Sequence, residues 1–121
     1  MAELSIDTVG GRRQYRPGEE VVGAAAWRLD KPPRTVEVRL FWRTEGKGTR
    51  DVGVVASERF ENPQATEVRE FRFKLPPGPY SFSGRLVSLI WALEAVAAPG
   101  GEAARIDITV SPTGQEVHVA G

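Results

Sequence analysis

The chain has 121 residues, which is enough for one domain with its own core and short for two. It contains no cysteine, which excludes disulfides and thiolate metal sites and removes the main sequence argument for an oxidising compartment. Sixteen basic residues balance sixteen acidic ones, and this formal net charge of zero gives no general attraction to nucleic acid or to anionic lipid.

The sequence carries neither a secretion signal nor a membrane span that we can identify. Its first residues, MAELSIDTV, lack a basic start followed by a continuous apolar run. The most apolar segment, residues 86–98, contains Glu94 and is about a dozen residues long, whereas a membrane helix needs about 20 apolar residues. We therefore expect no membrane span and a cytoplasmic location.

The first third of the chain predicts two strands joined by a tight turn. Residues 4–6 alternate with polar neighbours and indicate a short strand that ends at the glycines 10–11. Pro17 and Gly18 suit the central positions of a type II turn, because proline presets φ and glycine accepts the positive φ that follows. Residues 21–29 predict the second strand, whose small residues would let a bulky group approach closely. Its inward face would carry Val21, Gly23, Ala25, Trp27 and Leu29.

Three further strands follow. Residues 36–44 show the cleanest alternation, which indicates one buried and one wet face. A glycine-rich turn leads to a fourth strand at 52–60, and the segment ENPQAT leads to a fifth that ends at Leu75. The expected inward residues of the third strand are Val36, Val38, Leu40 and Trp42.

A stiff corner and an ambiguous apolar run come next. Three prolines in residues 76–79 remove backbone donors and fix φ, so neither a helix nor a central strand can pass through them. Residues 85–97 fit both the alternation of a strand and the stripe of a helix. We favour a strand at the centre of a sheet, because no N-cap with a charged first turn precedes Arg85 and the other apolar segments are short and alternating.

These patterns predict an all-β protein, an antiparallel β-sandwich of about seven strands with an immunoglobulin-like arrangement. The seventh strand is expected at residues 104–110. We expect one domain over 1–111 and a tail over 112–121, in which Val117 and Val119 could add a short edge strand. Trp27, Trp42 and Trp91 are expected to be core anchors whose indole N–H groups each find a partner.

Two stretches resemble the arrestin-like superfamily. Residues 15–23, YRPGEEVVG, resemble the Tyr-x-Pro-Gly-Glu-x-Val-x-Gly signature at the second strand of these domains, and residues 75–95 resemble their proline turn and following aromatic strand. The similarity covers almost the whole chain, from Leu4 to Val110. The matching positions, which the resemblance implies are fold-making, are Tyr15, Pro17, Gly18, Gly23, Pro76, Pro79, Ser81, Gly84 and Trp91.

The resemblance implies an arrestin-like sandwich that works as an adaptor or scaffold through protein contacts and is not an enzyme. Members of the superfamily usually carry two sandwiches in tandem, whereas this chain has room for one. The expected partner is a protein, which includes a second copy that pairs through an edge strand. The alternative is a sandwich that binds a small ligand or carbohydrate, for which Tyr80, Phe82 and Phe60 are the candidate aromatics because they flank turns.

The residues that could carry catalysis or bind a cofactor do not form a recognisable pattern. His118 is the single histidine and lies in the tail, so neither a metal site nor a nucleophilic triad is expected. The GKGT segment at 46–49 lacks the spacing of a phosphate loop and is expected to be a hairpin turn. Glu19 and Glu20 are neighbours that face opposite ways in a strand, so we interpret them as solvated charges.

One basic cluster remains. Arg12, Arg13 and Arg16 lie beside the first turn and could bind a phosphate or carboxylate group bidentately. The simpler interpretation is a soluble loop. Nucleic-acid binding is not expected, since it would need a broad basic face with exposed aromatics.

Overall fold

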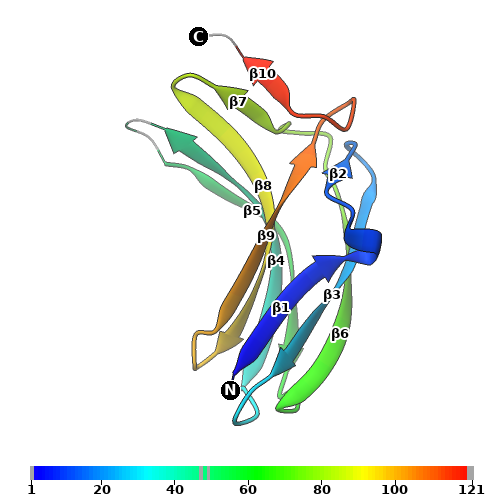
Figure 1. The fold of residues 1–121 in the computed structure, drawn as a ribbon, viewed down its shortest axis with the longest axis vertical. Helices are drawn as coiled ribbons and strands as arrows, with labels where there is room; N and C mark the ends of the chain where they lie inside the picture. The colour runs from blue at the N-terminus through cyan, green and yellow to red at the C-terminus, as the bar shows by residue number, and fades with distance from the viewer. Residues whose placement is uncertain (1, 47, 49, 120–121) are drawn as a thin grey trace.

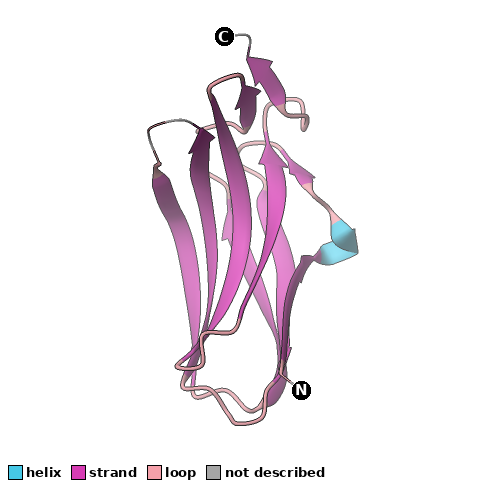
Figure 2. Ribbon diagram, turned by 60° about the vertical axis from the view of Figure 1, so that its left-hand side comes forward, coloured by secondary structure: helices cyan, strands magenta, loops and turns pink. Residues whose placement is uncertain are grey.

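The computed structural model describes residues 2–46, 48 and 50–119, and this part of the chain forms two β-sheets that pack face to face (Figure 1). Strands account for almost all of its regular structure (Figure 2), and the one helical element within the described residues is a single 3-10 turn. In chain order the elements are β1 (Glu3–Thr8), η1 (Val9–Gly11), β2 (Gln14–Tyr15), β3 (Glu20–Arg28), β4 (Thr35–Gly46), β5 (Val52–Glu61), β6 (Thr66–Lys74), β7 (Phe82–Gly84), β8 (Val87–Ala98), β9 (Ala103–Val110) and β10 (Val117–Val119).

The smaller sheet is antiparallel and has the strand order β1-β3-β6. The larger sheet has the order β10-β7-β8-β4-β5, and β9 pairs with β8 alongside β7. β1 begins at one end of the long axis of the molecule, and β10 lies at the opposite end (Figure 1). The predicted all-β sandwich is therefore confirmed.

The ambiguous run at 85–97 forms the central strand of the larger sheet, as expected. β8 pairs with β4 along twelve residues, with Trp42 opposite Trp91. Its alternate residues Leu89, Trp91 and Leu93 are buried in the core between the sheets, whereas Leu86 is exposed. A helix would have needed Leu86 on the buried stripe, so the helical interpretation is wrong.

Three short strands add to the seven expected, and one of them, β10, is the edge strand that Val117 and Val119 were expected to be able to form. β2, β7 and β10 have two or three residues each, which is too short for a period-two pattern to be recognised. β2 pairs with β9 and β10 pairs with β7, and both of these pairings are parallel in a sandwich that is otherwise antiparallel.

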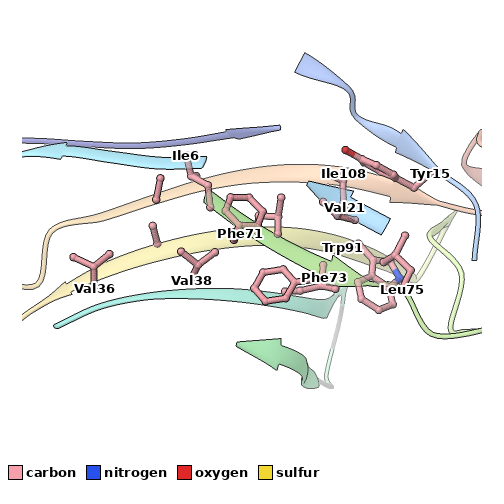
Figure 3. Close-up of a cluster of buried hydrophobic side chains, with 14 of the residues drawn as sticks. Ile6, Tyr15, Val21, Val36, Val38, Phe71, Phe73, Leu75, Trp91 and Ile108 are labelled. Carbon is pink, nitrogen blue, oxygen red and sulfur yellow. The ribbon is translucent and has the colours of Figure 1, made fainter. Parts of the chain in front are cut away.

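Two of the three tryptophans are core anchors, as expected. Trp27 is 3% exposed and donates from Nε1 to the carbonyl of Gln64 at 2.9 Å, and Trp91 is fully buried and donates to the carbonyl of Pro79 at 2.9 Å. The packing of Trp91 with its neighbours is shown in Figure 3. A buried indole needs such an acceptor, because an unpaired N–H costs free energy in a dry core.

The prediction for Trp42 was wrong in part, since this residue is only half-buried. It lies near the end of β4, and its ring covers the backbone of Gly53 on the neighbouring edge strand. The neighbouring Phe41 is 6% exposed but lies outside the core cluster. It points to the outer face of the sheet, where the guanidinium of Arg105 covers its ring at 5.4 Å.

Gly23 of β3 lies in close contact with both of its neighbouring strands, β1 and β6. A Cβ at this position would clash with the carbonyl oxygen of Asp7 and would lie 2.6 Å from Cζ of Phe71. The bulky group that the small residues of this strand admit is therefore the Phe71 ring, which stacks on Phe73 at 5.4 Å between centroids.

Replacing Gly23 by alanine is expected to destabilise the fold by about 1–3 kcal/mol, the usual cost of overpacking a core. The measurement is urea unfolding followed by tryptophan fluorescence. Gly78→Ala is the matched control, because a Cβ at Gly78 meets nothing within 4 Å. Equal stabilities of the two variants would show that the close approach at Gly23 has no energetic weight.

Candidate functional site

The turn at residues 15–19 has the predicted type II geometry. Gly18 has φ +85°, and the N–H of Glu19 donates to the carbonyl of Arg16 at 3.1 Å. The turn is tied to the proline corner, since Gly18 N donates to Leu75 O at 3.2 Å and Leu75 N donates to Glu19 O at 2.9 Å. The two stretches that carry the family resemblance thus contact each other directly.

The second stretch is anchored by Ser81. Its backbone N–H donates to the carbonyl of Val110 at 2.7 Å, and its Oγ accepts from the N–H of Val110 at 2.9 Å. The next residue, Ser111, donates from its N–H to the carbonyl of Tyr15 at 3.1 Å. The end of β9 therefore joins the proline corner on one side to the first turn on the other.

Three more positions of the two stretches that carry the family resemblance are Tyr15, Pro76 and Gly84. Tyr15 is 2% exposed and pairs with Val110, and its hydroxyl donates to the carbonyl of Arg12 at 3.3 Å. Pro76 is half-buried, and Gly84 ends β7 opposite Val119.

The three arginines singled out from the sequence lie around one open hollow of about 580 Å³. Arg12, Arg13 and Arg16 line it together with Gln14, Tyr15, Glu19, Thr113 and Gly114. The last two residues come from the tail, so the hollow joins segments that are about a hundred positions apart in sequence.

Internal contacts hold two of the three guanidinium groups. Arg12 stacks on the ring of Tyr15 at 4.3 Å and donates to Glu19 Oε1 at 2.8 Å. Arg13 is 2.8 Å from a carboxylate oxygen of Asp7. The side chain of Arg16 has no ion pair within the described part of the chain, while its backbone N–H donates to Glu19 at 2.6 Å.

These contacts lower the pKa of two carboxyl groups. The hydrogen bond from Arg12, followed by that from the backbone N–H of Arg16, lowers the pKa of Glu19 below its ordinary value. The hydrogen bond from Arg13, followed by that from the N–H of Thr8, does the same for Asp7. Both carboxyl groups are thus held ionised beside the hollow, where they compete with any external anion for the arginines.

The lowered pKa values predict acid sensitivity. A carboxyl whose pKa is lower in the folded state stabilises the fold above its unfolded pKa, and this contribution is lost as pH falls through the folded value. The ordinary pKa is 4.5 for Glu19 and 3.8 for Asp7, so the loss begins as pH falls below about 4.5. Urea unfolding across this range is expected to show a shallower decline for Glu19→Gln than for the wild type. Parallel profiles would contradict the assignment.

The aromatics proposed for a carbohydrate platform do not gather on one exposed face. Phe60 is buried, with its ring centroid 6.5 Å from that of Trp27 and the guanidinium of Arg69 above it. Phe82 is half-buried against the core, and Tyr80 alone is exposed. The prediction that Phe60 and Phe82 are available for stacking is therefore wrong, because strand ends in this sandwich still lie under the opposite sheet.

The structure also shows where the residues considered for catalysis, phosphate binding and metal binding lie. Glu19 forms an ion pair with Arg12, whereas Glu20 forms one with Arg72 of β6, so the two acids have different partners. His118 is exposed on β10. Lys47 and Thr49 of the GKGT segment lie outside the described residues. Within the residues that are described, no group of three or more His, Asp or Glu side chains is placed to hold a metal ion.

One feature of the larger sheet was not located by the sequence. β5 is its outer strand, and in the described structure it pairs on one side only, with β4. The first half, Val52–Ala56, contains no charge and no proline, and Val52 and Val54 are 65% and 59% exposed. The sequence shows valines in this run at positions that alternation would have given to polar residues, but it does not show that the run lies at the edge of a sheet.

No helix in the described part of the chain is long and apolar enough to cross a membrane.

The order of strands, the two packed sheets and the core between them define a β-sandwich of the arrestin-like and immunoglobulin-like kind. Among solved structures, the chain is similar to the sporulation control protein Spo0M from Bacillus subtilis, with a TM-score of 0.64 and 22% identity over 91% of this chain and 49% of that one. The chain therefore spans about half the length of Spo0M.

It is also similar to a CARDB domain from Pyrococcus furiosus, which was solved in complex with di-metal ions. The TM-score is 0.51, with 11% identity over 92% of this chain and 93% of that one. Neither family models nor curated proteins gave a match. The structural similarities confirm the expected arrestin-like sandwich fold.

Proposed function

We propose that this chain is a non-enzymatic, cytoplasmic protein-interaction module of the arrestin-like kind, which binds its partner by strand addition at the free edge of β5. The supporting observation is the first half of this strand, which contains no charged residue and no proline although a register shift leaves Val55 as an extra residue opposite Leu40 and Phe41. Its outward backbone groups have no partner strand in the described structure, and its exposed side chains are valines. An extended segment placed there would gain backbone hydrogen bonds and apolar contact together.

The β6 edge of the smaller sheet differs from the first half of β5, because charged side chains along an edge strand hinder pairing with another strand. β6 carries charged residues along its length, and Arg69 is paired with Glu67 while Arg72 is paired with Glu20. The second half of β5 is guarded in the same way by Glu58, Arg59 and Glu61. This contrast favours Val52–Ala56 as the interacting segment.

In its simplest form the partner is a second copy, with one β5 beside the other. The basic hollow of Arg12, Arg13 and Arg16 would give a second contact, for a carboxylate or phosphate group of a bound protein. In this proposal residues 1–111 form the domain, and the tail from residue 112 contributes an edge strand and one wall of that hollow.

Val54→Glu tests the β5 edge. If two copies pair there, the variant is expected to weaken the dimer about tenfold or more, since an unpaired carboxylate at a closed interface costs at least about 1.4 kcal/mol. Size-exclusion chromatography with light scattering, over a range of concentrations, gives the mass. Val68→Glu is the matched control, because Val68 is 66% exposed on β6 of the other sheet.

A wild-type chain that stays monomeric at every concentration would remove the homodimer. In that case the partner in strand addition is a different protein. The wild type and the Val68→Glu variant should capture this protein from cell extract, whereas the Val54→Glu variant should not capture it. Equal capture by all three would contradict a role for the β5 edge.

A further inference from the structure

The end of the sandwich where β8 finishes contains a preformed hollow of about 380 Å³. Its lining combines apolar side chains with three charged residues, Asp30, Lys31 and Glu102. The apolar lining consists of Leu29, Pro32, Pro33, Ala97 and Pro99.

The loops around this hollow are joined by backbone hydrogen bonds. Arg34 N donates to Ala98 O at 2.8 Å, which connects the loop before β4 to the last residue of β8. Ala97 N donates to Glu102 O at 2.8 Å, and Leu29 N donates to Ala65 O at 2.8 Å. Proline-rich loops held in this way lose little freedom when a ligand binds, so the hollow is ready to receive an apolar group.

The opposite end of β8 projects an apolar tip. Leu86 is 67% exposed and Val87 is 39% exposed, and Arg85 precedes them with no ion pair within the described chain. The tip is fixed by close backbone packing, because Gly46 of β4 lies against Leu86 so tightly that a Cβ there would clash with the carbonyl oxygen of Leu86. A large apolar side chain beside a cation is thus held out at this end.

The tip and the hollow lie at the two ends of one strand. β8 has twelve residues, which separates its ends by about 40 Å, and Figure 1 shows these ends at opposite extremes of the long axis. The two features cannot meet within one molecule. They can meet between successive copies.

We propose that copies of this chain associate head to tail, with Leu86 of one copy in the proline-lined hollow of the next and Arg85 beside Glu102. The apolar tip matches the apolar residues of the lining, and the guanidinium of Arg85 is complementary in charge to the carboxylate of Glu102. Such an interface is heterologous. Every row of copies keeps one unused tip at one end and one unused hollow at the other, so the association is open-ended. It leaves the β5 edge uncovered and does not depend on the proposed function.

Leu86→Glu tests the apolar part of the contact. The experiment uses the Val54→Glu variant as its background, because this substitution removes any pairing through β5. Sedimentation velocity of this variant is expected to show a sedimentation coefficient that rises with concentration. Adding Leu86→Glu should weaken this association about tenfold or more. Val9→Glu is the matched control, since Val9 is 68% exposed on η1 and lies at neither end of β8.

A charge swap tests the direction of the contact. Arg85→Glu and Glu102→Arg are each expected to weaken self-association about threefold or more, because like charges then face each other. A mixture of the two single variants should associate again, since each tip now meets an oppositely charged hollow on the other variant. A symmetric tip-to-tip contact would give no such recovery from Glu102→Arg.

The positions of the contacting residues give a second measurement. Amide chemical shifts that change with concentration are expected in residues 29–34 and 97–102 and at 84–87. A strictly monomeric chain at millimolar concentration would overturn the proposal. So would equal effects of Leu86→Glu and Val9→Glu, or a mixture of charge variants no more associated than its components. Failure of these tests leaves the β5 proposal untouched, because that edge is disabled in the background used.

Discussion

The structure depends on keeping alternate side chains of β8 in the dry layer between the sheets. This strand is paired on both sides, with β4 on one and with β7 and β9 in succession on the other. Trp91 sits fully buried near its middle, and the carbonyl of Pro79 satisfies its indole N–H. The stiff proline corner is thus part of the core as well as a turn, because it supplies the acceptor that makes burial of the largest side chain possible.

Much of the fold followed from the sequence, for physical reasons that the individual residues make clear. Period-two alternation located the long strands, since burial of one face requires it, and Pro17-Gly18 specified its turn because few residues accept the positive φ of the third position. The short strands β2 and β7 were not predicted, because two or three residues are too few to show a period. Trp42 was predicted to be a core anchor because alternation places it on the same face as Trp91, but alternation does not show that its ring packs over the edge strand at Gly53, where it stays half-exposed.

The candidate sites were harder to predict, since each joins segments that are distant in sequence. The Arg12, Arg13 and Arg16 cluster was visible as a run of charge, but its Glu19 and Asp7 counter-ions and its wall from the tail appear only in three dimensions. The edge status of β5 depends on strand order, which a pattern of valines does not encode. The prediction that Phe60 and Phe82 are available for stacking was wrong, because the position of a residue beside a turn does not show whether the opposite sheet covers it.

The places where the chain enters and leaves the sandwich also constrain larger assemblies. β1 starts near the proline-lined end, whereas β10 lies beside the tip of β8. A second domain attached after β10 by a short linker would therefore continue the long axis instead of folding back beside the first. Covalent tandems of this unit would favour rod-like over side-by-side geometry, and the length of the linker would set how far they depart from it.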